Sequence, residues 1–233
     1  MKRRTLALGL VAVFALTAAQ CADRAPSADA AQTEAAQTEA QTQPVSLDTE
    51  PTAAADTAIF AGGCFWCMEP PFEKLDGVFS VTSGFAGGTT PDPTYKEVSS
   101  GTTDYEEAVQ VIYDPEVVSF ETLVEVFWHN IDPFAENRQF CDRGTQYRSV
   151  LFYRNAEQQA VAEASYETLD ARFDEPIATT VEPATDFYAA EAYHQDFYRT
   201  NPDRYYSYRK GCGRDARLEA IWGEAAGHDG PLG

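Results

Sequence analysis

The stretch "TAIFAGGCFWCMEPPF" (residues 57–72) decides how the domain begins. Its first seven residues are mostly apolar and end in Gly62-Gly63, which is typical of a short buried strand followed by a turn. Cys64 then stands at the expected start of a helix, where unpaired backbone N–H groups and the helix dipole favour a thiolate. Pro70-Pro71 cannot donate amide hydrogens and are expected to kink or stop this helix. The stretch therefore predicts a nucleophilic cysteine at a strand-to-helix junction.

The two ends of the 233-residue chain are not expected to belong to the globular domain. Residues 1–21 begin with basic side chains followed by an apolar run of the length of a secretory h-region, which predicts an export signal. Cys21 follows this run and is a candidate for lipid attachment. Residues 22–57 repeat Ala-Gln-Thr-Glu with almost no bulky apolar side chain, which predicts a disordered acidic linker. One domain is expected over residues 58–223, with a flexible tail at 224–233.

The chain is strongly acidic, with 37 Asp and Glu against 17 Lys and Arg and a net charge of −20. Such a surface repels phosphate backbones and anionic lipid, so nucleic acid is excluded as an expected partner. No nucleotide-binding loop, metalloprotease helix or serine nucleophile elbow occurs in the sequence, so neither a bound cofactor nor a metal is expected. We expect an exported bacterial monomer, periplasmic or anchored to the membrane through Cys21 and facing the periplasm.

The rest of the domain alternates between strand and helix patterns. Ser119 and Asn155 each precede an apolar helical pattern and are expected to be N-caps. The alternation predicts an α/β (α+β) fold: a two-layer sandwich with a mixed β-sheet core, ferredoxin-like, with long catalytic loops. The expected strands are residues 57–63, 107–113, 146–154 and 176–183, and the expected helices are residues 119–130, 155–173 and 188–202.

Glu107 is the first candidate for acid–base chemistry. On a strand it shares one face with Val109, Val111 and Tyr113, so a carboxyl group heads an otherwise apolar row. A buried carboxyl has a raised pKa and stays protonated near neutral pH, which suits a general acid. The neighbouring Glu106 is expected to point the other way.

The segment "QFCDRGTQYRSVLFY" (residues 139–153) supplies a second group of polar side chains. Residues 142–144 are expected to form a turn that opens onto a strand, with Tyr147 on the strand face that Thr145 begins. A tyrosine hydroxyl can donate a hydrogen bond to an oxygen that is gaining charge. Tyr147 is therefore a candidate to assist a general acid.

Several separated motifs together resemble one known family. The motifs are "GGCFW", "SGFAGG", "PTYKEVSSGTT", "EAVQVIYDP", "DRGTQYRS" and "YHQDFYRTNP", they occur in the family's order, and they cover most of residues 58–202. This pattern resembles the peptide methionine sulfoxide reductases of the A type. The resemblance implies a mixed α/β sandwich that reduces the S epimer of methionine sulfoxide, free or in oxidised proteins, and so repairs them.

The resemblance also implies a role for individual residues. Cys64 would be the nucleophile and Glu107 the proton donor to the sulfoxide oxygen. The hydroxyls of Tyr95 and Tyr147 would assist the donor. Asp142 would orient the substrate or hold the site together.

Phe65 and Trp66 would form the pocket for the S-methyl group of the substrate, and as aromatic side chains they are suited to exclude water. His194 matches a family position and is expected to brace the fold, whereas His129 lies on an apolar helix face and is expected in the core. The chain departs from the family at residues 104–106, which read Asp-Tyr-Glu in place of the usual Gly-His-Ala.

The chemistry requires a second thiol. Attack on the sulfoxide leaves a sulfenic acid on the nucleophile, a second thiol condenses with it to a disulfide, and an external thioredoxin-like dithiol restores the enzyme. Cys212, between two glycines near the C-terminus, is ranked first for this resolving role. Cys67, three residues from Cys64, is ranked second, and Cys141 beside Asp142 makes a relay conceivable.

Three other readings of the cysteines stay open at this point. "CFWC" after a strand also suits a thioredoxin-like thiol–disulfide oxidoreductase, although the prolines at 70 and 71 argue against the long helix that class needs. In an exported protein Cys64 and Cys67 could simply form a disulfide. A structural zinc site built from Cys64, Cys67, Cys141 and Cys212 is disfavoured because two of these ligands stand 71 residues apart.

Overall fold

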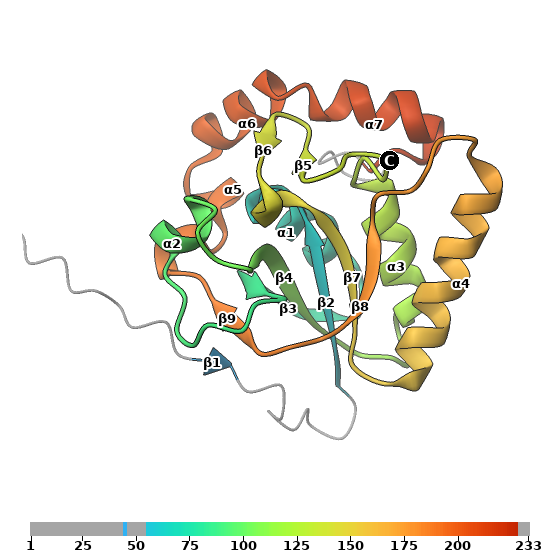
Figure 1. Ribbon diagram of the computed structural model, residues 1–233, viewed down its shortest axis with the longest axis horizontal. Helices are drawn as coiled ribbons and strands as arrows, with labels where there is room; N and C mark the ends of the chain where they lie inside the picture. The colour runs from blue at the N-terminus through green and yellow to red at the C-terminus, as the bar shows by residue number, and fades with distance from the viewer. Residues whose placement is uncertain (1–43, 46–54, 228–233) are drawn as a thin grey trace, which may run out of the picture. The chain divides into compact units, whose positions relative to one another are not determined.

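A mixed β-sheet forms the centre of the computed structural model, which describes residues 44–45 and 55–227 (Figure 1). The sheet has seven strands in the order β1-β9-β3-β4-β2-β7-β8, and β7 and β8 pair in parallel whereas the other neighbours are antiparallel. The predicted α/β fold with a mixed sheet is confirmed. The strands of this sheet are β1 (Pro44–Val45), β2 (Asp56–Gly62), β3 (Val78–Ala86), β4 (Glu106–Tyr113), β7 (Ser149–Tyr153), β8 (Thr180–Pro183) and β9 (Phe187–Ala189).

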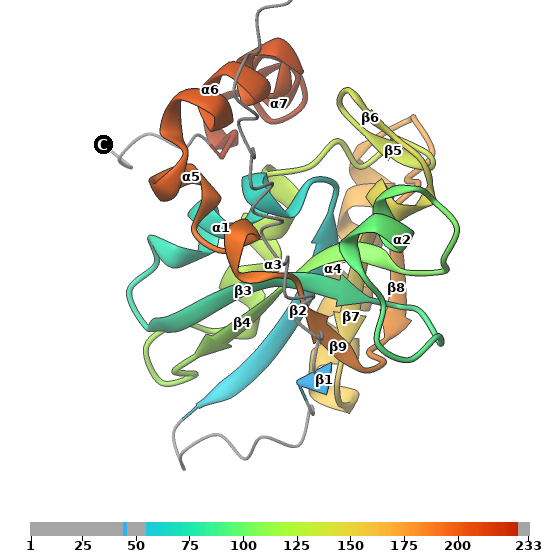
Figure 2. The same ribbon diagram turned by 90° about the vertical axis from the view of Figure 1, so that its left-hand side faces the viewer.

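Helices and a small hairpin complete the described fold. The hairpin pairs β5 (Arg138–Gln139) with β6 (Asp142–Arg143). It lies at the same end of the sheet as the C-terminal helices α6 and α7, as both views show (Figures 1 and 2). The α-helices are α1 (Phe65–Glu73), α2 (Tyr95–Ser99), α3 (Phe120–His129), α4 (Ala156–Arg172), α5 (Phe197–Thr200), α6 (Pro202–Gly211) and α7 (Arg214–Trp222), and short 3-10 helices span Thr145–Tyr147, Ala192–His194 and Gly223–Ala225.

Alternation along the central strands separates two apolar layers. Phe60 of β2 and Leu151 of β7 belong to the large core that also takes in apolar residues of α1, α3 and α4. Ile59 and Phe152, each one residue along, belong to a smaller cluster with Phe187. Successive strand residues point to opposite faces, so one face carries the helices and the other a thinner cover, as expected for a two-layer sandwich.

Most elements form where local signals placed them. β2 and β4 match the expected strands to within one residue. The Ser119 Oγ accepts a hydrogen bond of 3.1 Å from the Thr122 amide, and the Asn155 Oδ1 accepts one of 2.8 Å from the Gln158 amide. Both predicted N-caps are therefore confirmed at the starts of α3 and α4.

The expectation that two prolines stop the first helix is wrong. α1 runs through Pro70 and Pro71 and ends two residues later at Glu73. The two prolines have no amide hydrogen to donate to the preceding turn of the helix, but burial of the helix against the sheet compensates for this cost.

The prediction of a single helix over residues 188–202 is also wrong. That span contains β9, a 3-10 turn and α5, and Pro202 begins α6 instead of ending a helix. The side chain of Gln195 explains the break, because it bonds both the amide and the carbonyl of Ser83 and the carbonyl of Ala190, each at 2.9 Å. Asp196 follows with a left-handed φ of 52°, which no helix continues.

Two loop regions hold short helices that differ from the expectation. Tyr147 lies on a 3-10 helix rather than on a strand, and β7 begins only at Ser149. The sequence signals given above place no helix or strand in residues 83–106, yet β3 ends there and α2 forms inside them. Its signal was present in the sequence, since Thr94 and Glu97 form a capping box at its start.

The predicted export signal and most of the predicted linker lie outside the described residues. Within that linker, residues 44–45 form β1 and pair with Phe187 and Tyr188 of β9. At the other end, Ala226 of the predicted flexible tail is buried and the Gly227 amide donates to the His129 carbonyl at 2.9 Å. Among residues 44–45 and 55–227, none of the helices has the length and apolar character needed to cross a membrane.

Candidate active site

The strand-to-helix turn after β2 places Cys64 at the N-cap of α1. Gly63 makes the turn with a left-handed φ of 79°, and a Cβ at this position would approach the Cβ of Gln139 to 2.4 Å. Only glycine fits both conditions without strain. Cys64 is 6 % exposed, so it is almost completely enclosed but still reached by solvent.

The expected thiolate at this helix end is not what the surroundings favour. Burial raises the pKa of the Cys64 thiol well above its ordinary value, and the hydrogen bond with Cys67 and the charges of Cys67, Glu107 and Asp142 raise it further. The half-charge of a helix N-terminus is too small to offset desolvation next to several acids. Cys64 therefore rests as a thiol that shares its surroundings with a second thiol, Cys67.

Glu107 lies directly against the nucleophile's turn. It begins the apolar row of β4 as expected, is 2 % exposed, and its Oε2 accepts a hydrogen bond of 3.1 Å from the Phe65 amide. Burial raises the pKa of Glu107 to about 8, although that hydrogen bond opposes the rise. The carboxyl group is thus protonated at neutral pH and is hydrogen-bonded to the residue that follows Cys64. The expected burial of this acid is confirmed.

The unusual residues 104–106 leave Glu107 in place because each finds its own partner. The Asp104 carboxylate accepts from the Thr89 hydroxyl at 2.8 Å, and the Tyr105 hydroxyl donates to the Thr90 carbonyl at 2.7 Å. Glu106 points to the opposite side of β4, as expected, and forms an ion pair with Arg148.

Tyr95 and Tyr147 reach the same site from different elements. Tyr95 begins α2, and its ring lies 6.2 Å from that of Phe65. Burial raises the pKa of both phenols, and the charges of Glu107 and Cys64 act on each of them. The two hydroxyls therefore stay protonated as neutral donors beside the acid and the thiol.

The aromatic pair after Cys64 divides into an inner and an outer ring. Phe65 is buried and packs against Phe85 and His194. Trp66 is only partly covered and stacks on Phe197 with ring centroids 3.7 Å apart. Its indole N–H donates to the His194 Nδ1 at 3.1 Å, and burial lowers the pKa of His194 to about 4, so this histidine is a neutral acceptor that fixes Trp66.

Asp142 has a partner that the sequence analysis missed. The hydroxyl of Tyr208, on α6, donates to Asp142 Oδ2. The ring of Tyr208 also meets Trp66 edge-on at 6.1 Å, and the charges of Cys64 and Cys67 act on its hydroxyl. Nothing local marks Tyr208, because its role depends on α6 folding back onto the hairpin of β5 and β6.

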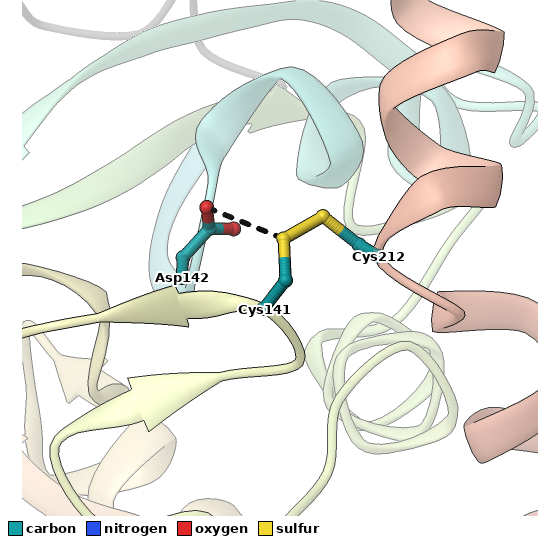
Figure 3. Close-up of side chains that lie close together, drawn as sticks. All are labelled: Cys141, Asp142 and Cys212. Atoms are coloured by element: carbon teal, nitrogen blue, oxygen red, sulfur yellow. Dashed lines mark hydrogen bonds between the residues drawn. A yellow bond between two sulfur atoms is a disulfide. The ribbon is translucent and has the colours of Figure 1, made fainter. Parts of the chain in front are cut away.

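The four cysteines of the domain form two separate pairs. Cys141 and Cys212 form a disulfide, with Cα atoms 4.9 Å apart (Figure 3). Cys64 and Cys67 keep their thiols. Cys212, ranked first as the resolving thiol, therefore holds no thiol in this structure. In residues 44–45 and 55–227, the group of possible metal ligands that contains Cys141 and Cys212 has Asp142 as its third member. Cys64 and Cys67 are not part of it, so the four cysteines do not converge on a zinc site.

An enclosed thiol facing a protonated carboxyl and two phenols defines a class of protein. Such a site suits a thiol-dependent reductase whose substrate oxygen must be protonated as it leaves, whereas a disulfide substrate has no oxygen to which the two phenols could donate. The site therefore disfavours the thioredoxin-like alternative.

The chain belongs to the peptide methionine sulfoxide reductase family, whose model matches residues 56–226. It is 54 % identical over 169 residues to the peptide methionine sulfoxide reductase MsrA of Streptococcus agalactiae serotype III (strain NEM316), an alignment that covers 72 % of this chain and 99 % of that one. It is 48 % identical over 169 residues to MsrA of Bacillus velezensis, covering 72 % and 96 %. The chain is thus an oxidoreductase of this family.

Solved structures agree with the family assignment. The crystal structure of Mxr1 from Saccharomyces cerevisiae in reduced form matches with a TM-score of 0.61 and 35 % identity, covering 64 % of this chain and 87 % of that chain. Methionine sulfoxide reductase A of Corynebacterium diphtheriae matches with a TM-score of 0.59 and 35 % identity, covering 65 % and 77 %. The two-layer sandwich is therefore the fold of this family.

Proposed function

We propose that this protein reduces the S epimer of methionine sulfoxide, free or within proteins, with Cys64 as nucleophile and Glu107 as proton donor. The observation that carries the proposal is the hydrogen bond between the Phe65 amide and Glu107, which fixes a buried acid beside the thiol. Family membership supports the reaction, and the positions of these side chains support the roles.

The first step transfers the sulfoxide oxygen to Cys64. The Cys64 sulfur attacks the sulfoxide sulfur and forms an S–S bond while Glu107 protonates the sulfoxide oxygen, and the Tyr95 and Tyr147 hydroxyls stabilise the charge that develops on it. The protonated oxygen then transfers to the Cys64 sulfur as this S–S bond and the S–O bond of the substrate break. The products are methionine and the sulfenic acid of Cys64. Trp66 and Phe65 offer the apolar surface that receives the S-methyl group, which is the feature that would select one epimer.

For the second step we favour Cys67 as the resolving thiol. Its thiol hydrogen-bonds Cys64, and the Cys67 amide donates to the Cys64 carbonyl at 3.0 Å, so condensation needs no movement of the C-terminal helices. The Cys67 thiol and the sulfenic acid of Cys64 yield a disulfide and water. Cys212 and Cys141, already joined to each other, are less suited to this step.

An external thioredoxin-like dithiol would then reduce the Cys64–Cys67 disulfide and become oxidised itself.

We further propose that the protein acts after export, as a monomer in the bacterial periplasm or on a lipid anchor at Cys21 facing the periplasm. The basic and apolar N-terminus supports export, and the Cys141–Cys212 disulfide suits an oxidising compartment.

The test compares native protein with Cys64→Ser on each epimer of a methionine sulfoxide peptide, with dithiothreitol as reductant. Native protein should convert the S epimer and leave the R epimer, and Cys64→Ser should convert neither. Cys141→Ser removes a cysteine outside the proposed catalytic pair, so it is the matched control and should stay active. Turnover by Cys64→Ser equal to that of native protein would remove the assigned nucleophile.

A further inference from the structure

Two linkages join the same two short segments at the edge of the active site. One is the Cys141–Cys212 disulfide, and the other is the hydrogen bond from Tyr208 to Asp142. Cys141 adjoins Asp142 in sequence, with its sulfur 3.8 Å from Asp142 Oδ1 (Figure 3). Cys212 lies one helical turn after Tyr208, and its amide donates to the Tyr208 carbonyl at 2.9 Å. The disulfide therefore fixes the register of the hydrogen bond.

The hydrogen bond lies inside the site rather than behind it. The Asp142 charge acts on the Cys64 thiol, and the Tyr208 ring forms an edge contact with Trp66. The burial of Asp142 raises its pKa, and the hydrogen bond from Tyr208 opposes this rise and favours the carboxylate. Without Tyr208, a carboxylate next to the substrate pocket would lose both its direction and its main donor.

The second pair of cysteines differs from the catalytic pair in exposure. Cys64 and Cys67 are both buried, whereas Cys141 is exposed and Cys212 is half-buried. An exposed disulfide next to a buried dithiol has two possible uses. It can pass electrons inward, or it can hold two segments together, and these uses make different predictions for the number of electrons the protein stores.

Resting on the proposed function, we propose that Tyr208 is a positioning residue that fixes the Asp142 carboxylate for substrate binding. We also propose that the Cys141–Cys212 disulfide is the tether of this pair and does not supply electrons for turnover. Its reduction would loosen α6 from the hairpin of β5 and β6 without removing any group that reacts with the sulfoxide.

The first experiment counts electrons. The protein is fully reduced, freed of reductant and mixed with excess S-methionine sulfoxide, and the methionine formed per chain is measured. The tether predicts one methionine, because Cys64 and Cys67 supply two electrons. Two methionines in the native protein, falling to one in the Cys141→Ser/Cys212→Ser variant, would show that this pair feeds the active site and would overturn the tether.

The second experiment measures positioning in single turnovers without added reductant. For Tyr208→Phe we expect the substrate concentration at half-maximal rate to rise roughly five- to tenfold, with the maximal rate within about threefold of native. Compared with native protein in which Cys64 and Cys67 are reduced while Cys141 and Cys212 stay joined, Cys141→Ser/Cys212→Ser should shift the same quantity in the same direction. Tyr206→Phe is the control, since this α6 side chain is 51 % exposed and its ring packs on Tyr205.

Two further outcomes complete the test. In an Asp142→Ala background, Tyr208→Phe should have no additional effect, because the tyrosine acts through that carboxylate. A full additional effect there, or native behaviour of Tyr208→Phe alone, would overturn the positioning role. Failure of the proposed function would look different, since native protein itself would then form no methionine. The phenylalanine variant keeps the ring, and circular dichroism confirms that it is folded.

Discussion

At the residue scale, the site places two groups with raised pKa values next to each other, and this fixes a pH profile. Below pH 8 Glu107 is protonated, so the single-turnover rate should rise tenfold per pH unit with the Cys64 thiolate. Above pH 8 the loss of protonated Glu107 cancels the gain in thiolate, so the rate should become level until Cys64 itself ionises. Rapid-quench measurements between pH 6 and 10 would record this break near pH 8.

The matched variant for this profile is Glu107→Gln. It should react about 10² to 10⁴ times more slowly, and its rate should keep rising through pH 8 because no carboxyl titrates. Glu106→Gln, on the opposite side of β4 and paired with Arg148, is the control and should keep the native break. A break that survives in Glu107→Gln would assign the titration to another group.

At the scale of elements, α1 carries a second buried acid that the reaction does not use. Glu69 is fully buried beside Ser83 and the Asp196 amide, but neither contact has hydrogen-bond geometry. Burial raises the pKa of Glu69 to about 8. An acid whose pKa is higher in the folded than in the unfolded state stabilises the fold most at low pH, and this stabilisation is lost as the pH rises from about 4.5 to about 8.

Glu69→Gln should therefore gain stability relative to native protein as the pH rises. We expect the difference in free energy of unfolding between variant and native to change by roughly 1 to 3 kcal/mol from pH 5 to pH 8.5 in the variant's favour. Urea unfolding at several pH values measures it. Glu167→Gln, exposed on α4, should show no such trend. A constant difference for Glu69→Gln across this range would mean that the pKa of Glu69 is not raised in the folded state.

Arg148, just before β7, links β4 and β8 through two acids. It pairs with the buried Glu106 of β4 and with Glu182 of β8 at 2.8 Å. Arg148→Met would leave Glu106 buried without its cation and should cost about 3 kcal/mol, the usual range for a broken buried pair. Adding Glu106→Gln should restore a good part of this loss, as chemical denaturation of the single and double variants would show. Equal losses in both would mean that the pair is not coupled.

Which elements the sequence predicts follows from how local their causes are. The N-caps Ser119 and Asn155 bond amides three residues on, so their signals lie within one turn of helix. Gln195 instead breaks a predicted helix by bonding Ser83, 112 residues away. Cys64 and Glu107 could be placed because strand periodicity and a family pattern cover them, whereas Tyr208 depends on how α6 packs, which the local pattern does not record.

At the scale of the whole molecule, the two cysteine pairs of the domain are in different redox states. The Cys141–Cys212 disulfide spans 71 residues and joins the hairpin to the C-terminal helices, and such a bond persists in oxidising surroundings. Cys64 and Cys67 must both carry free thiols at the start of the proposed reaction. The export proposed above would therefore require one pair to stay oxidised and the other reduced in the same compartment, and a reductant that reaches the buried pair.

This arrangement predicts the thiol count of the exported protein. Purified from the periplasm and denatured at once in iodoacetamide, each chain should show two alkylated thiols, Cys64 and Cys67, and one disulfide, Cys141–Cys212. Cys21 should not add to the count in either case, because signal cleavage after residue 21 would remove it, whereas lipid attachment at Cys21 would block its thiol. Protein made in the reducing cytoplasm, without the leader, should show four alkylated thiols. Four thiols in the periplasmic protein would mean that the compartment leaves the tether open, and that α6 is held on the hairpin by the Tyr208–Asp142 hydrogen bond alone.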